Sequence, residues 1–453
     1  MSAFWFATAL LPTGWTSDVR ISVKDGRITA VEPGAPAHPA DEHHAIAIPG
    51  LANVHSHAFQ RGMAGLAEHR GGAGAGIDNV WSWREVMYRF LDRLTPDDVE
   101  AIAAMAYTEM LEGGYTHVGE FHYLHNDAQG RGYSNPAEMA ASVAHAAHAT
   151  GIGLTLLPVF YAHSNFGGQA PNRGQRRFIH SLDSFAAMLE ACRPLLTDGD
   201  RLGIAPHSLR AVTGEELAAL VAMHPDGPIH IHAAEQQKEV QDSFAFSGQR
   251  PVEWLLAHAD LDERWCLIHA THLTDQETDA LATSGAVAGL CPITEANLGD
   301  GTFPALRYLQ AGGRIATGTD SNILIDPAQE LRALEYSQRL AHQARNVLAS
   351  KAQPSTARAL FEATLAGGAQ AMGIIQGLAV GNPADFVTLS ADHPALHGRT
   401  GDHLLDNWVF TARGSCIDTV WKRGKQVVSG GRHRDVEPIT ARYRKVIERI
   451  MGA

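Results

Sequence analysis

Leu51-Ala-Asn-Val-His-Ser-His-Ala-Phe-Gln60 is the stretch around which this chain is organised. It predicts a short apolar strand that ends in the pair His55 and His57 and then enters a loop. Side chains two positions apart in a strand point to the same face, so both imidazoles can reach one ion. A His-x-His pair is weak by itself, because a chain with 25 histidines contains such pairs by chance. The pair becomes a candidate metal site because further possible ligands follow at the ends of strands predicted later in the chain.

The composition indicates a globular protein with a large core. Of 453 residues, 45% are hydrophobic and 19% charged, and the length admits one large domain with an accessory one, or two or three ordinary domains. A net charge of −13 argues against a nucleic-acid or anionic membrane surface, since both need a basic face.

The four cysteines include no C-x-x-C pair, which predicts buried free thiols in a reducing compartment. The apolar N-terminus lacks the positive region of a signal peptide, and no apolar run reaches the length of a membrane span. We therefore expect the protein in the cytoplasm.

The middle of the chain alternates strands with helical segments, which is typical of a parallel sheet with crossover helices. A helix is marked by Thr95 as its N-cap, Pro96 at its first position and Gly113-Gly114 at its end. Eight β/α units predict an α/β fold of the closed (β/α)8 TIM-barrel type, whose catalytic groups lie at the C-terminal strand ends. The candidate strands are 51–55, 115–121, 153–160, 202–206, 228–232, 265–269, 286–290 and 314–317.

Both chain ends are β-rich and are predicted to form one small β-sandwich beside the barrel. At the N-terminus three strands are expected, and Asp25-Gly26 predicts a hairpin between the last two. So small a sheet needs a partner, which the C-terminal stretches 377–389 and 416–428 supply. The expected N-terminal strands are 3–11, 18–24 and 27–32. The predicted boundaries are 1–48 and 376–432 for the sandwich, 49–375 for the barrel and 433–453 for a C-terminal helix.

The tail from Thr440 onward has an amphipathic helical pattern, with Tyr443, Val446 and Ile450 on one side. We expect that side to pack on the barrel or on a partner chain.

Six metal-type or proton-transfer residues share one location: each lies at or just past the end of a predicted strand. Histidines placed at random in a core would not share it. Four of the six supply the imidazole and carboxylate ligands of a catalytic zinc site, where water becomes a nucleophile near neutral pH. The pattern therefore indicates hydrolysis. The six are His55, His57, His207, His232, His269 and Asp320, and the four ligands are His55, His57, His232 and Asp320.

Glu235 and His269 fit the proton transfers that hydrolysis needs. Glu235 follows His232 by three positions, so its carboxylate can face the open metal position. The alternative is an ordinary acid at the start of a helix. His269 can orient the attacking hydroxide, while His230 and His272 are interpreted as structural.

Two loops border the predicted barrel mouth. The run Gly71-Gly-Ala-Gly-Ala-Gly76 lacks the Lys-Ser/Thr of a phosphate loop and is interpreted as a flexible loop. The segment 161–177 is long enough for a lid, although a solvated connection is an equal alternative.

At the strand ends the sequence resembles the mononuclear zinc deaminase branch of the amidohydrolase superfamily, and the resemblance covers the whole chain. The motifs that carry it are Val54-His-Ser-His57, His232-Ala-Ala-Glu235, His269 and Gly318-Thr-Asp320. The resemblance implies one zinc ion per subunit. Binuclear relatives carry a bridging lysine that Gly203-Ile-Ala-Pro-His-Ser-Leu-Arg210 lacks.

Longer stretches resemble the formimidoylglutamate deiminase family of that branch, without departure at the metal or proton-transfer positions. They are His55-Ser-His-Ala-Phe-Gln-Arg61, Trp81-Ser-Trp-Arg-Glu-Val-Met-Tyr-Arg89, Gly119-Glu-Phe-His-Tyr-Leu-His125, Ala205-Pro-His-Ser-Leu-Arg-Ala-Val212 and His232-Ala-Ala-Glu-Gln-Gln237. The resemblance implies hydrolysis of N-formimino-L-glutamate to N-formyl-L-glutamate and ammonia in histidine degradation, by a homodimer. It implies Glu235, His269 and Asp320 as catalytic residues, and Gln60, Arg84, Tyr123, His207 and Arg210 as substrate-binding residues.

The two arginines also make chemical sense for a substrate with two carboxylates, because a guanidinium binds a carboxylate through two hydrogen bonds. The alternative for each is a surface salt bridge. Two other functions stay open: a purine or pterin deaminase of the same branch, such as a guanine deaminase, and a non-catalytic metal-binding or scaffold protein.

Overall fold

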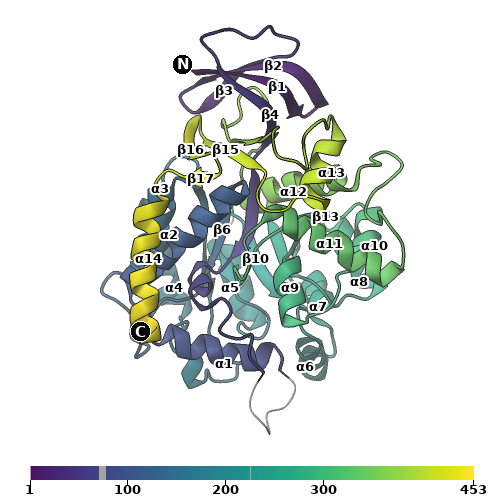
Figure 1. Cartoon of the computed structure of the whole chain (residues 1–453). Coiled ribbons are helices and arrows are strands. Elements are labelled where there is room, and N and C mark those ends of the chain that lie inside the picture. The colour runs from purple at the N-terminus through teal and green to yellow at the C-terminus, as the bar shows by residue number, and fades with distance from the viewer. Residues whose placement is uncertain (1, 71–77, 225, 453) are drawn as a thin grey trace.

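Parallel strands form a closed barrel in the computed structural model, which describes residues 2–70, 78–224 and 226–452 (Figure 1). One arc of the barrel runs from β5 to β8 and β9, and the other from β10 to β13. Bridges between Ile204 and Ile229 and between Ser56 and Asp320 join the arcs on both sides. The predicted closed barrel is confirmed. Its strands are β5 (Leu51–Ser56), β6 (Tyr115–His122), β7 (Gly153–Phe160), β8 (Arg201–Leu202), β9 (Ala205–Pro206), β10 (Ile229–Ala233), β11 (Trp265–His269), β12 (Val287–Leu290) and β13 (Arg314–Thr317).

The fourth strand position differs from the sequence prediction, because two short strands, β8 and β9, replace one continuous strand. Gly203 lies between them. A Cβ atom there would be 2.6 Å from Leu157 Cδ2 and 2.7 Å from the Pro228 carbonyl oxygen, so the backbone approaches its neighbours too closely for a side chain. β11 and β13 have the predicted bounds.

Helices cover the outside of the barrel (Figure 1). In α2 the predicted ends are confirmed: the Thr95 side chain accepts from Asp98 N–H, and Gly114 ends the helix with φ 105°. The α-helices are α1 (Val80–Leu91), α2 (Pro96–Gly113), α3 (Glu138–Thr150), α4 (Leu182–Cys192), α5 (Gly214–Met223), α6 (Gln237–Ser247), α7 (Pro251–His258), α8 (Asp275–Thr283), α9 (Pro292–Leu298), α10 (Ala305–Gln310), α11 (Pro327–His342), α12 (Thr356–Met372), α13 (Asp402–Phe410) and α14 (Val436–Met451). Short 3-10 helices are η1 (Ala58–Met63), η2 (Arg173–Gln175) and η3 (Arg193–Leu195).

Segments from both chain ends form one mixed sheet, with the order β17-β16-β15-β14-β4-β1-β2-β3. The sequence prediction missed β4, which pairs in parallel with β1 and antiparallel with β14 and so joins the two ends. Its first three residues, Glu42-His-His, are polar, so the sequence pattern did not indicate a strand there. The strands are β1 (Ser2–Leu11), β2 (Gly14–Lys24), β3 (Arg27–Glu32), β4 (Glu42–Pro49), β14 (Phe386–Leu389), β15 (Ile417–Lys422), β16 (Lys425–Ser429) and β17 (Arg432–His433).

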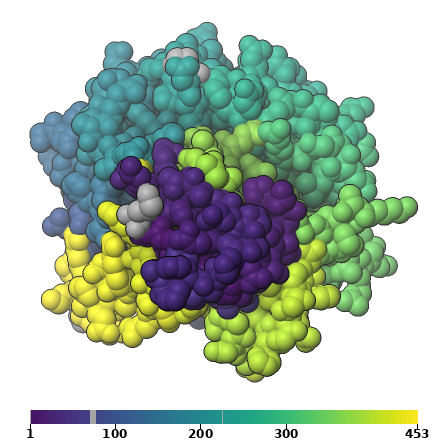
Figure 2. Space-filling view, turned by 90° about the horizontal axis from the view of Figure 1, so that it is seen from above, coloured from purple at the N-terminus to yellow at the C-terminus, as the bar shows by residue number. Residues whose placement is uncertain are grey.

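The sheet curls over its own apolar face. Phe4 of β1 and Trp421 of β15 lie three strands apart in the sheet order, yet their ring centroids are 4.8 Å apart. In a flat sheet, strands three positions apart are separated by about 14 Å. The predicted sandwich is therefore one folded sheet with its own small core, and Figure 2 looks down on its N-terminal part above the barrel.

Helix α14 begins at Val436 rather than at residue 433, because Arg432–His433 is strand β17. It packs on α2, with Ile450 buried and Tyr443 and Val446 against the main core. None of the helices in the described part of the chain has the length and apolar character of a transmembrane segment. The glycine run 71–76 lies outside the described residues. The domain boundaries stay predictions.

Helix α12 packs directly against barrel strands β5 and β13. We expect Gly367→Ala to destabilise the fold by about 1–3 kcal/mol, because its Cβ would lie 2.0 Å from the Ile315 carbonyl oxygen and force the helix outward. The matched control is Gly368→Ala, whose Cβ would have its nearest contact at 3.4 Å, to Ala52 Cβ, and which should stay within about 1 kcal/mol. Thermal unfolding of both variants tests this, and equal melting temperatures would contradict it.

Candidate functional site

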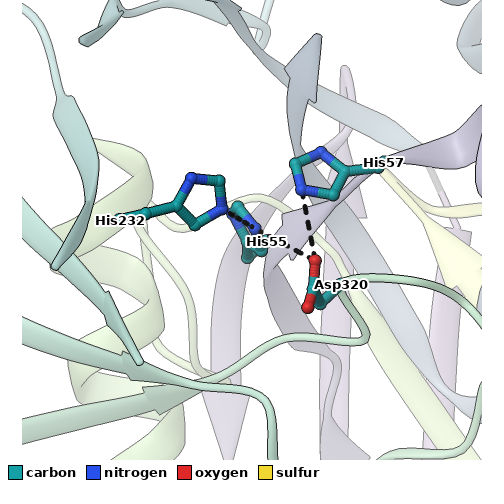
Figure 3. Close-up of side chains that lie close together, drawn as sticks. All are labelled: His55, His57, His232 and Asp320. Carbon is teal, nitrogen blue, oxygen red and sulfur yellow. Dashed lines mark hydrogen bonds and ion pairs between the residues drawn. The ribbon is translucent and has the colours of Figure 1, made fainter. Parts of the chain in front are cut away.

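Three histidines and one aspartate converge at the C-terminal ends of the barrel strands (Figure 3). His55 lies near the end of β5, His57 just after it, His232 on β10 and Asp320 just after β13. All four are buried, with at most 6% of any residue exposed. The four residues predicted as metal ligands are therefore brought together from three separate strands.

The cluster is compact. Asp320 Oδ1 lies 3.3 Å from His55 Nε2 and 3.2 Å from His57 Nε2, and His232 Nε2 lies 3.1 Å from His55 Nε2. One ligand atom from each residue lies within 4.8 Å of those of the others. Imidazole nitrogens and a carboxylate oxygen facing one another are the donor set of a catalytic zinc site. These residues fit a divalent metal ion.

Hydrogen bonds on the far side of the rings orient two of the imidazoles. His57 Nδ1 lies 2.8 Å from the Phe121 carbonyl oxygen and His232 Nδ1 lies 3.1 Å from that of His207. A proton on each Nδ1 leaves the Nε2 lone pair free to face the cluster. Burial lowers the pKa of His55 to about 3, so that ring is neutral as a metal ligand requires.

His269 ends β11 beside the cluster. Its Nε2 lies 3.9 Å from Asp320 Oδ2 and its Nδ1 lies 3.2 Å from Glu295 Oε1. Burial opposes protonation, but the carboxylates of Glu235, Glu295 and Asp320 together raise the pKa of His269 to about 10. The ring of His269 is thus held in orientation beside the cluster by Glu295, a residue of α9 that sequence reasoning missed.

Strained backbone is concentrated at these strand ends. Positive φ angles occur at Ala234 (49°) after β10, His269 (67°) on β11, and Asp320 (45°) and Asn322 (54°) after β13. Residues other than glycine rarely adopt this region, and such outliers cluster at functional sites. Asn322 Nδ2 donates to the His57 carbonyl oxygen at 3.1 Å and holds the two loops together. This residue was also missed.

A cavity opens next to the cluster. His55 lies behind the other ligands and does not line it. Among its lining residues are the eight predicted for substrate binding or catalysis, and several that sequence reasoning did not assign, such as Trp81, Tyr88 and Glu239. The eight are Gln60, Arg84, Tyr123, His207, Arg210, Glu235, His269 and Asp320. Trp81 lies in the stretch Trp81–Arg89, which resembles the family, so the sequence could have indicated it.

The cavity residues are pre-arranged by mutual contacts. Gln60 Nε2 donates to the Tyr123 hydroxyl at 2.6 Å, and Arg84 Nη2 donates to the Tyr88 hydroxyl at 2.8 Å. Arg210 is 8% exposed and is thus not part of a surface salt bridge. A cavity with two guanidinium groups beside a metal-type cluster suits an anionic substrate.

His230 has the structural role predicted for it, because it is fully buried and its Nε2 bonds the Ala371 carbonyl oxygen at 2.8 Å. The segment 161–177, for which a lid and a solvated connection were equal alternatives, is buried at both ends. Tyr161 is 2% exposed and Arg177 1% exposed, and Arg177 Nη2 donates to the Leu94 carbonyl oxygen at 3.1 Å. The end of this segment at Arg177 is therefore fixed to the connection between α1 and α2.

Comparison with protein families matches residues 46–427 to the amidohydrolase family and residues 1–45 to the N-terminal domain of formimidoylglutamate deiminase HutF. The chain is 48% identical to the formimidoylglutamate deiminase of Pseudomonas aeruginosa over all of both chains. It is 28% identical to a 5-methylthioadenosine/S-adenosylhomocysteine deaminase of Natronomonas pharaonis, over 91% of this chain and 88% of that one.

Two solved structures are similar along the whole chain. An amidohydrolase from Brucella melitensis matches with a TM-score of 0.96 and 52% identity, with all of both chains covered. An adenosine deaminase from Xanthomonas campestris with bound zinc matches with a TM-score of 0.79 and 22% identity, over 100% of this chain and 98% of that one, which shows a shared fold.

The donor set predicts that the protein binds one divalent ion per chain. Asp320→Asn should lose most of it, because the amide removes the charged oxygen that faces His55 and His57. Elemental analysis after zinc loading and dialysis measures this. Asp242→Asn is the control, since Asp242 pairs with Lys238 on α6 away from the cavity. Equal metal content in both variants would contradict the site.

Proposed function

Because this chain belongs to the amidohydrolase family, we propose that it hydrolyses N-formimino-L-glutamate to N-formyl-L-glutamate and ammonia. The observation that carries this proposal is one cavity that holds both the His/Asp cluster and two arginines, in a chain 48% identical to a formimidoylglutamate deiminase over its full length. The His/Asp cluster can activate the water that attacks the formimino carbon, and the two arginines can bind the two carboxylates of the substrate.

We propose zinc as the metal, held by His55, His57, His232 and Asp320. A zinc ion bound there supplies Lewis acidity that makes water nucleophilic near neutral pH. Water then adds its oxygen to the formimino carbon, and both of its hydrogens pass to the terminal nitrogen. The C–N bond to that nitrogen breaks, so that ammonia leaves and the N-formyl carbonyl group remains.

The side chains around the cluster manage the protons of this reaction. Asp320 accepts the proton that the attacking water loses. His269, which its raised pKa keeps protonated at neutral pH, orients the attacking oxygen, and Glu295 steadies His269 through its Nδ1. Glu235 lines the same cavity and delivers a proton to the departing nitrogen. Its backbone N–H donates to Glu239 Oε2 at 3.1 Å, which supports a fixed position for the segment that carries it.

Substrate recognition falls to residues that line the cavity. Arg84 and Arg210 bind the two carboxylates through paired hydrogen bonds. The remaining polar contacts are supplied by Gln60, Tyr123 and His207. The guanidinium groups are already partly desolvated, so they interact with an anion more strongly than exposed groups would.

We further propose that the enzyme acts in histidine degradation, in the cytoplasm and as a homodimer. All four cysteines are buried and free, which supports a reducing compartment. The net charge of −13 supports a small-molecule partner rather than a nucleic acid.

A substrate comparison tests the reaction. Purified, zinc-loaded protein should release ammonia from N-formimino-L-glutamate, and far more slowly from guanine or 5-methylthioadenosine. The aromatic rings of Trp81, Tyr88 and Phe178 in the cavity are the feature that favours a purine. Ammonia from a purine alone would overturn the assignment, and no turnover of any of these substrates would favour a non-catalytic metal-binding protein.

Glu235→Gln should lower kcat at least about a hundredfold while zinc content and melting temperature stay unchanged, since the amide keeps the shape but cannot donate the proton. The comparison is with Asp242→Asn on the following helix, which should retain full activity. An active Glu235→Gln enzyme would remove Glu235 from the mechanism.

A further inference from the structure

Trp81 lies in the first turn of α1 and lines the cavity. The Asn79 side chain caps the helix by accepting from Trp81 N–H at 2.9 Å and Ser82 N–H at 3.4 Å. Residues three and seven positions further, Arg84 and Tyr88, fall on the same face of a helix as Trp81. The cap therefore fixes which face of α1 is presented to the cavity.

Two guanidinium groups pack against the Trp81 indole. The Arg84 Cζ atom lies 5.0 Å from the ring centroid and the Arg210 Cζ atom lies 5.9 Å from it. Arg84 belongs to the same helix, whereas Arg210 comes from the loop after β9 on another part of the barrel. One ring thus contacts both arginines that we propose for substrate binding.

Within the described residues, neither guanidinium has a hydrogen-bonded carboxylate. Arg84 donates to the Tyr88 hydroxyl, and the carboxylate oxygen closest to Arg210 is Glu239 Oε1, 4.0 Å from its Nε. Arg210 Nε is buried and has no hydrogen-bond partner. Two like charges in one cavity repel each other. Glu239, which pairs with Arg210, offsets part of this repulsion, and the negative face of the indole, which contacts both guanidinium groups, offsets it for both.

We infer that Trp81 is a positioning residue: its indole holds the Arg84 and Arg210 guanidinium groups in one arrangement and so makes the cavity selective for a substrate with two carboxylates. This rests on the proposed function for the role of the two arginines. A carboxylate in place of the ring would compete with the substrate, whereas the ring face takes up no N–H donor of either arginine.

A binding experiment tests this without relying on turnover. The zinc-loaded full chain is titrated by calorimetry with N-formyl-L-glutamate and with N-formyl-L-norvaline, which replaces the side-chain carboxylate by a methyl group. The wild type should prefer the dicarboxylate strongly. Trp81→Leu should reduce this preference about tenfold or more, and Trp81→Phe, which keeps a π face, should reduce it less. A wild type without the preference, or a Trp81→Leu variant that keeps it, would overturn the inference.

Two further measurements separate positioning from a space-filling role. In an Arg210→Gln background, Trp81→Leu should change the preference less than about threefold, whereas equal losses in both backgrounds would point to cavity shape alone. Trp254→Leu, which removes a tryptophan that stacks on His258 away from the cavity, should leave the preference unchanged. A Trp81 variant that loses the preference and also melts well below the wild type would count against the positioning role, because a damaged fold would then explain the loss.

Failure of the inference on Trp81 can be distinguished from failure of the proposed reaction. Absence of ammonia release from N-formimino-L-glutamate by the wild type would remove the reaction, while the dicarboxylate preference still decides the role of Trp81. With turnover present, Trp81→Leu should raise KM about tenfold or more and leave kcat within about threefold, since the ring acts through its contacts with the two arginines. A fall in kcat with unchanged KM would overturn the inference.

Discussion

Backbone hydrogen bonds between the first and last barrel strands determine where the cluster forms. Asp320 N–H donates to the His55 carbonyl oxygen at 2.9 Å, and His57 N–H donates to the Asp320 carbonyl oxygen at 3.0 Å. The bonds that close the ring of strands are therefore the bonds that place the carboxylate beside two imidazoles. Since they involve the main chain, the cluster has the rigidity of the barrel rather than that of a loop.

Burying the three imidazoles and the Asp320 carboxylate together costs the metal-free protein folding free energy. Burying polar side chains costs free energy unless they are hydrogen-bonded, and His55 Nδ1 has no partner among the described residues. The positive φ angles at His269 and Asp320 add backbone strain at the same place. A site that is costly without a cation gains most when one binds, so its geometry and its affinity for a metal have the same origin.

Local rules made part of this structure predictable from sequence. Strand and helix patterns follow from side-chain periodicity, and ligands at strand ends follow from barrel geometry, which explains why the barrel and the placement of His232 were found. Other features depend on tertiary context. β4 begins with Glu42-His-His and becomes a strand because β1 and β14 flank it. Glu295 and Asn322 lack a distinguishing pattern, since an acid in a short helix or an amide in a loop is usually solvated.

The order of strands in the eight-stranded sheet has a consequence for biosynthesis. β4 lies between β1, made at the start of translation, and β14, made after the whole barrel. Until Phe386–Leu389 leaves the ribosome, β4 presents an unpaired edge, and such edges invite pairing with other chains. The sheet can thus reach its native form only after the whole barrel has been synthesised, although it contains the first residues of the chain. Chains whose translation stalls while the barrel sequence is being synthesised keep this edge unpaired for longest, and they are therefore the species most prone to aggregation.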